Sequence, residues 1–145
     1  MEGEGKMGLV YEEITLKNIY DMADYEDGLI KESEIRQITV QALVDTGAST
    51  LVINEEIREK LGLKIKGKRY ATLANSKKEV CKKTDAVEII WKDRSSTIPA
   101  LVVPGNGKVL LGAIPLEDMD LIVDPSRQVL VHAHGDEILT YIMCA

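Results

Sequence analysis

The residues best suited to chemistry in this sequence are Asp45, Thr46 and Gly47, which follow an alternating apolar stretch. From Ile38 to Val44 every second residue is apolar, which predicts a half-buried strand that ends at the carboxylate. Gly47 permits a sharp turn that exposes backbone N–H groups beside Asp45. A carboxylate presented in this way at the base of a cleft could act as a general acid or base.

A second run, Val109-Leu110-Leu111-Gly112, makes the first one more informative. It is a short apolar run bounded by glycines, which predicts a strand buried on both sides. Pro115 is tolerated only in the first turn of a helix, so we expect a helix of one or two turns directly afterwards. The tripeptide at Asp45 is common by chance, but its combination with this second run is rare.

Together, Ala42 to Ser49 and Leu110-Leu111-Gly112 resemble the retropepsin-like aspartic proteases (clan AA), in particular the small single-domain members found in prokaryotes. The resemblance spans roughly Ile35 to Leu130. It implies a mainly β acid-protease half-barrel with one or two short helices, closed as a homodimer. It also implies an aspartic endopeptidase that acts on peptides or proteins and uses neither metal nor cofactor.

One motif per chain is insufficient for this chemistry. One carboxyl group must accept a proton from water while another donates a proton to the carbonyl oxygen, so two aspartates must face each other. Proteases of the pepsin type carry two motifs in a chain of about twice this length, whereas this sequence has only the motif at Asp45. We therefore expect two copies to pair about a symmetry axis and their two Asp45 carboxyl groups to share one proton.

The resemblance also implies roles for individual residues. Asp45 would be the catalytic acid and base, Thr46 would brace the pair across the dimer axis, and Gly47 would contact substrate. Ala48 and Ser49 would shape the same loop, and the run at Leu110, Leu111 and Gly112 would support it. Alternation in Tyr70 to Val80 predicts a hairpin, and by the resemblance the hairpin from about Arg69 to Glu79 corresponds to the family's flap. Its tip residues are Leu73, Ala74, Asn75, Ser76 and Lys77, and they depart from the Gly-rich flaps of retroviral enzymes.

The remaining patterns predict mostly strands and one substantial helix. The helix is expected after Asn54, a plausible N-cap, and should stop at Gly62. We expect further strands at Leu9–Leu16, at Ala86–Trp91, and on either side of a turn at 124–127, with an acidic excursion at Asn18–Gly28. One domain at 35–145 is predicted, preceded by an N-terminal extension at 1–34 that adds a strand or hairpin.

Composition argues against several classes of partner. The net charge of −6 disfavours nucleic acid, and the cluster at 64–69, with Lys77, Lys78, Lys82 and Lys83, is interpreted as a solvated strand face. No apolar stretch is long enough to span a membrane, and no signal peptide is visible, so we expect a cytoplasmic protein. Cys81 and Cys144 are expected to be free thiols, and His132 and His134 to be surface or packing residues.

Three alternatives remain open. The dimer could have lost turnover and serve as a peptide-binding or scaffold module. Actin-like sugar kinases carry a similar Asp-x-Gly-x-Thr loop around phosphate, but they need a longer chain with further nucleotide loops. The apolar run at 138–143 could close the core as a strand, or could be an edge strand that joins the partner's terminus.

Overall fold

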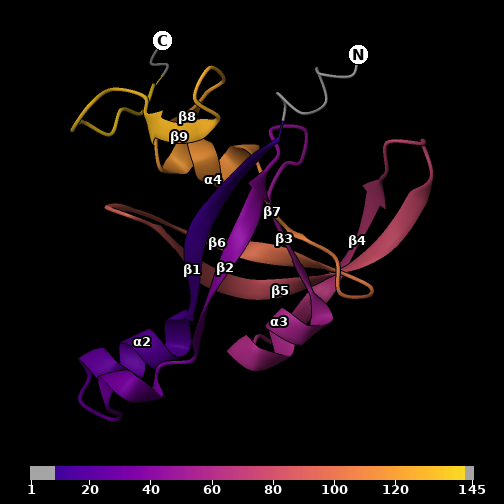
Figure 1. Ribbon diagram of the computed structural model, residues 1–145. Helices are drawn as coiled ribbons and strands as arrows, with labels where there is room; N and C mark the ends of the chain where they lie inside the picture. The colour runs from indigo at the N-terminus through magenta and orange to yellow at the C-terminus, as the bar shows by residue number, and fades with distance from the viewer. Residues whose placement is uncertain (1–8, 143–145) are drawn as a thin grey trace.

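Six strands close into a barrel in the computed structural model, which describes residues 9–142 (Figure 1). Their order around the barrel is β1-β2-β7-β3-β6-β5, and β1 pairs with β5 to complete the ring. The mainly β fold that the sequence predicts is confirmed. The strands are β1 (Val10–Asn18), β2 (Gln37–Val44), β3 (Leu51–Asn54), β5 (Lys78–Trp91), β6 (Arg94–Val103) and β7 (Val109–Leu111).

The position of β7 determines the path of the loop that carries the acidic motif. This strand lies between β2 and β3 and runs parallel to β2 and antiparallel to β3. Leu111 is in register with Val44 on one side and with Leu51 on the other. The connection from β2 to β3, residues 45–50, must therefore pass over the end of β7.

The barrel interior is filled by aliphatic side chains, as expected for a chain without Phe. Its members alternate along their strands, so that each strand presents one apolar face to the interior. Many of them are β-branched, which favours strands. Its largest fully buried side chains on the strands are those of Ile14, Leu16, Leu51, Ile53, Val87, Ile89 and Leu111.

The predicted hairpin exists and projects from the barrel as β4 (Ile65–Thr72) paired with the first half of β5 (Figure 1). The prediction of a separate strand at Ala86–Trp91 is wrong, because those residues continue β5. A bulge between Lys83 and Ala86 lets this strand pass from the hairpin into the barrel. Thr84 lies at the bulge, and its hydroxyl oxygen accepts a hydrogen bond from the N–H of Ala100 (3.0 Å).

The helix predicted after Asn54 is α3 (Glu55–Leu61). The Asn54 side chain accepts a hydrogen bond from the N–H of Ile57 (2.9 Å), and Gly62 ends the helix with a φ of 66°. The helix predicted around Pro115 is α4 (Ala113–Asp118), with the proline in its first turn.

The acidic segment at Asn18–Gly28 is not an irregular excursion but contains a helix, α2 (Ile19–Glu26), followed by a short 3-10 turn, η1 (Glu32–Glu34). The sequence of α2 has no apolar stripe that would predict a helix, because the residue that this helix buries is Asp21. Asn18 caps its first turn by accepting from the N–H of Asp21 (3.0 Å). The carboxylate of Asp21 in turn accepts from Arg36, which ties the helix to the start of β2.

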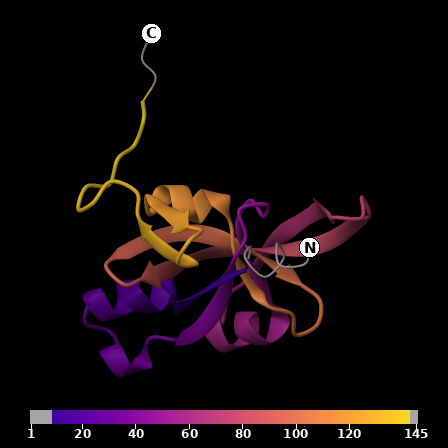
Figure 2. The ribbon, with the colours of Figure 1, turned by 45° about the horizontal axis from the view of Figure 1, so that its top comes forward.

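The last elements, β8 (Leu121–Asp124) and β9 (Val129–His132), form the expected hairpin beside α4. The alternative that the apolar run at 138–143 closes the core as a strand is wrong for residues 138–142, which form no strand. Tyr141 and Ile142 are 81% and 78% exposed, and Figure 2 shows this end extending away from the body. Met143 and Cys144 lie outside the described residues. No helix within residues 9–142 has the length and apolar character to cross a membrane.

We expect Asp21→Asn to lower the free energy of unfolding at pH 7 by about 1–3 kcal/mol, because it weakens several charge-assisted hydrogen bonds. Hydrogen bonds from Arg36 hold the pKa of Asp21 below its ordinary value. A lowered folded-state pKa stabilises the fold above the unfolded-state value of about 3.9, and this stabilisation is lost as pH falls through the folded-state pKa. Urea denaturation should therefore show a gap between wild type and variant that shrinks on acidification.

The control for this prediction is Asp27→Asn, at an exposed position just beyond α2. It should leave the free energy of unfolding nearly unchanged at both pH values. A gap for Asp21→Asn that is equally large at pH 7 and well below pH 4 would contradict the assignment.

Candidate functional site

The loop that carries Asp45 is held by backbone hydrogen bonds. The N–H of Asp45 donates to the carbonyl of Leu111 in β7 (3.0 Å), and the N–H of Ala48 donates to the carbonyl of Asp45 (3.0 Å). The N–H of Gly47 donates to Oδ1 of Asp45 (2.9 Å). The orientation of the carboxylate is therefore set by the turn that follows it.

Gly112 locks the loop from the opposite side. The N–H groups of Ala113 and Ile114 donate to the carbonyls of Ala48 (2.8 Å) and Ser49 (3.0 Å). A Cβ atom at Gly112 would lie only 2.4 Å from the carbonyl oxygen of Thr50 and 2.6 Å from that of Ala48. The position accepts only glycine, because the atoms in the way belong to the backbone.

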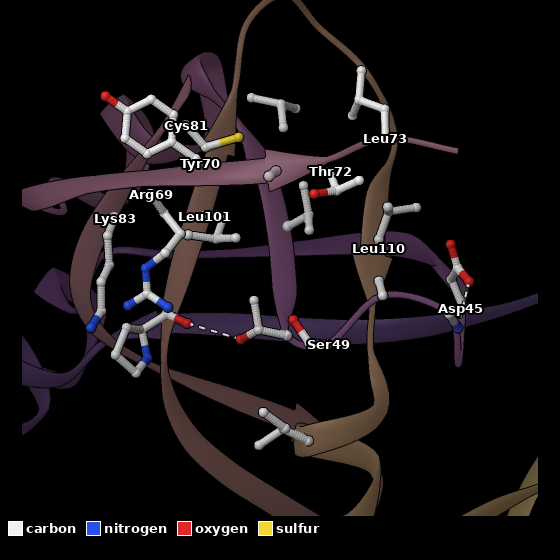
Figure 3. A pocket seen from close by; sticks show the side chains of 18 of the residues that line it. Asp45, Ser49, Arg69, Tyr70, Thr72, Leu73, Cys81, Lys83, Leu101 and Leu110 are labelled. Atoms are coloured by element: carbon white, nitrogen blue, oxygen red, sulfur yellow. Dashed lines mark hydrogen bonds between the residues drawn. The ribbon is translucent and has the colours of Figure 1, made fainter. Parts of the chain in front are cut away.

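A groove of about 900 Å³ lies between this loop and the β4–β5 hairpin (Figure 3). Much of its lining is aliphatic, with Val52, Leu101, Val103, Leu110 and Ile114 contributing apolar side chains. The hairpin contributes a continuous stretch from Arg69 to Ala74. A mostly apolar lining with a few polar groups is typical of a ligand-binding groove.

Asp45 is the acidic side chain among the groove residues. It is half-buried, and within residues 9–142 its carboxylate has no basic partner and accepts from the N–H of Gly47. One oxygen is thus oriented by the protein while the group remains accessible from the groove. Such a carboxylate can exchange a proton with a bound water or substrate.

Cys81 also lines the groove and is 2% exposed. Burial raises the pKa of its thiol above the ordinary value, and the negative charge of Glu79 acts in the same direction. A neutral, buried thiol is a poor nucleophile.

The structure brings together part of the predicted site. Asp45, Gly47, Ala48, Ser49, Leu110, Leu73 and Ala74 line the groove. Leu111 and Gly112 lie behind the loop, where they support it from the barrel. Thr46 is exposed at the loop surface, and Asn75, Ser76 and Lys77 form the exposed tip of the hairpin. Their predicted roles, which all concern a second subunit or a substrate, stay predictions.

Sequence reasoning missed most of the groove wall. The lining residues that it did not single out are Thr50, Val52, Cys81, Ile98, Pro99, Leu101, Val103 and Ile114, and it interpreted Arg69 and Lys83 as part of a solvated strand face. Pairing of β4 with β5 in the correct register would have placed Arg69 and Lys83 on one face. That signal requires a known register, which alternation alone does not supply.

The two histidines pair with carboxylates away from the groove. His132 Nε2 lies 2.9 Å from Asp93, and its ring packs edge-on against Trp91. His134 Nδ1 lies 2.8 Å from Asp120, whose carboxylate also accepts from the N–H of Leu139 (3.0 Å). In the described part of the chain, no three His, Cys, Asp or Glu residues are grouped so as to hold a metal ion.

Comparison with known proteins agrees with this geometry. A family model described as "Aspartyl protease" matches residues 32–114, which include both the Asp45 loop and Gly112. The fold is similar to the crystal structure of the retroviral protease-like domain of Ddi1 from Leishmania major, with a TM-score of 0.56 and 13% sequence identity. That alignment covers 87% of this chain and 89% of the other. No curated protein matches the sequence.

We expect Gly112→Ala to destabilise the protein by at least about 2 kcal/mol, because a methyl group would collide with backbone atoms of the Asp45 loop. The matched control is Gly107→Ala, where nothing lies within 4 Å of the added Cβ. Urea denaturation should show a lower midpoint for Gly112→Ala and an unchanged or slightly higher one for the control. Equal midpoints for the two variants would show that the loop is not locked at Gly112.

Proposed function

This chain belongs to the retropepsin-like aspartyl proteases, and we propose that two copies of it assemble into an endopeptidase. The observation that carries the proposal is the accessible Asp45 carboxylate in an apolar groove, oriented by the intact Asp-Thr-Gly turn. Because no basic side chain within residues 9–142 is paired with it, Asp45 is suited to proton exchange rather than to a structural ion pair.

A second copy is required because one Asp45 supplies half of the chemistry. Thr46 and Gly47 are exposed at the surface of the loop, so another copy has access to the carboxylate from that side. A twofold axis beside the loop would place two identical carboxyl groups next to each other. Two such groups cannot both ionise at short range, so the pair would hold one proton between them.

In the proposed reaction, the ionised Asp45 takes a proton from a water molecule, whose oxygen attacks the peptide carbonyl carbon. The protonated Asp45 of the partner subunit donates its proton to the carbonyl oxygen, which gives a tetrahedral diol. Asp45 then returns its proton to the amide nitrogen while a diol hydroxyl gives a proton back to the partner's Asp45. The C–N bond breaks, an acid and an amine are released, and the pair again holds one proton. The β4–β5 hairpin would cover the bound peptide, because its residues from Arg69 to Ala74 already form one wall of the groove.

The C-terminal segment supplies apolar surface for the assembly. It is anchored as far as Leu139, whose N–H donates to Asp120, while buried Arg94 binds the carbonyl of Gly135 (2.8 Å). Beyond this anchor, Tyr141 and Ile142 remain largely exposed. Exposed apolar residues at a chain end are suited to pair with the same segment of a second copy.

One feature favours a second candidate function, a peptide-binding dimer without turnover. The hairpin tip contains no glycine, and Ser76 adopts a φ of 68°, which is strained for a residue with a side chain. A tip that opens and closes in each cycle would be easier to build with glycine. A binding module needs the groove but not this cycle.

We expect Asp45→Asn to abolish cleavage of a diverse peptide library, with a loss of at least about a thousandfold in kcat/KM. An amide cannot accept the proton from water, while its similar shape should leave the fold and the dimer intact. Mass-spectrometric detection of products and light scattering for the solution mass provide the two measurements. The control Asp27→Asn, far from the groove at the end of α2, should cleave like wild type.

Peptide binding by wild type without products would favour the non-catalytic module. Equal cleavage by wild type and Asp45→Asn would refute the catalytic role of this residue.

We expect the double variant Tyr141→Asp/Ile142→Asp to shift the protein toward monomer and to reduce cleavage in proportion to the loss of dimer. Charges at these exposed positions leave the barrel untouched but oppose an apolar contact between copies. Tyr20→Asp/Leu29→Asp is the matched control, since these residues are also 53% and 71% exposed but lie on the opposite, α2 side. Sedimentation should show the wild-type mass for the control. A wild-type mass for Tyr141→Asp/Ile142→Asp as well would place the interface elsewhere.

A further inference from the structure

The groove holds two positive side chains whose role is not explained by the reaction. Three charged residues line it, namely Asp45, Arg69 and Lys83. Figure 3 shows Arg69 and Lys83 extending from the hairpin into the same side of the groove, with Asp45 at the other side. The rest of the wall is apolar or uncharged, so these two cations dominate the potential at their end.

Strand register explains why the two cations lie together. In the β4–β5 ladder, Arg69 is opposite Cys81 and Gly67 is opposite Lys83. Arg69 and Lys83 are therefore diagonal neighbours on one face, a separation of about 7–8 Å between backbones. Gly67 has no side chain to stand between them. Long side chains at diagonal positions are within reach of each other, so an anion placed between these two like charges would interact with both.

The described protein does not provide that anion. Within residues 9–142, neither Arg69 nor Lys83 has an ion pair, although Arg36, Arg58 and Lys82 each have an acidic partner. Glu79 is the other diagonal neighbour of Arg69, yet it forms no ion pair with it in the described structure and does not line the groove. Lys66, Lys68, Lys77 and Lys78 on the same hairpin also have no ion pair within the described residues, so what distinguishes Arg69 and Lys83 is that both line the groove.

We propose that Arg69 and Lys83 form a subsite for an acidic side chain of the peptide that occupies the groove. The inference rests on the proposed function, because it assumes a peptide running from Asp45 toward the cations. The aliphatic wall would take the apolar residues near the cleaved bond, and a Glu or Asp farther along would neutralise the pair. The substrate class is then a peptide with an apolar centre flanked by acid.

Twofold symmetry makes the inference more specific. A homodimer carries one Arg69–Lys83 pair on each side of the two Asp45 groups. Acidic residues should therefore be preferred both before and after the cleaved bond, at similar distances from it. A single acidic position on one side would not be expected from a symmetric groove.

The test uses matched fluorescein-labelled peptides that share an apolar centre and differ in one outer residue, Glu, Gln or Lys. Binding to the full-length Asp45→Asn protein is measured by fluorescence anisotropy, and cleavage by wild type is measured in parallel. Glu peptides should bind and be cleaved about three- to tenfold better than Lys peptides. The preference should weaken as salt is raised, because exposed charges are screened.

Charge reversal assigns the preference to these residues. Arg69→Glu/Lys83→Glu should abolish or invert the Glu-over-Lys preference. Lys66→Glu/Lys68→Glu changes the net charge equally on the same hairpin, but these side chains do not line the groove. This control should keep the wild-type preference, and circular dichroism should show that both variants are folded.

The outcomes separate the subsite from the proposed function. Selective binding of Glu peptides that only Arg69→Glu/Lys83→Glu removes supports the subsite, even if wild type cleaves nothing and the endopeptidase proposal fails. Equal binding of Glu and Lys peptides overturns the subsite, even if cleavage depends on Asp45. A preference that both charge reversals remove equally also overturns it, because the effect would then come from the overall field.

Discussion

The backbone of Gly112 lies against the carbonyls of Ala48 and Thr50 so closely that no side chain would fit between them. This contact exists because β7 is inserted between β2 and β3, which forces their connection across its end. The hydrogen bonds from Asp45, Ala113 and Ile114 then fasten the connection on both sides. A buried, well-packed barrel thus holds an accessible carboxylate in one orientation, which is what catalysis by a preorganised group requires.

The same architecture separates a rigid part from an adaptable one. The barrel carries Asp45, while the projecting β4–β5 hairpin forms the facing wall of the groove and is joined to the barrel sheet through the pairing of β5 with β6. Elements with few buried contacts open most readily, so the hairpin is the part suited to admit and release a peptide. Each copy would then supply half of the reacting pair and one wall of the groove.

Much of this could be predicted from the sequence, because strong local signals agreed with the final structure. Alternation before Asp45, the cap at Asn54, the stop at Gly62 and the proline of α4 all act within a few residues. Helix α2 escaped prediction because an ion pair between Asp21 and Arg36 stabilises it in place of an apolar face. Most residues of the groove wall were not predicted, because their positions depend on strand register, and register is decided by the whole barrel.

The central claim is that each active site contains two Asp45 groups from different subunits. Mixing wild type with increasing fractions of Asp45→Asn, after subunit exchange, tests it directly through the specific activity at constant total protein. If both carboxyl groups are required, random pairing predicts activity that falls with the square of the wild-type fraction, to about a quarter at equal mixing. Activity of about half at equal mixing would show that each subunit acts independently, and about three-quarters would show that one Asp45 per dimer suffices. Either result would contradict the account.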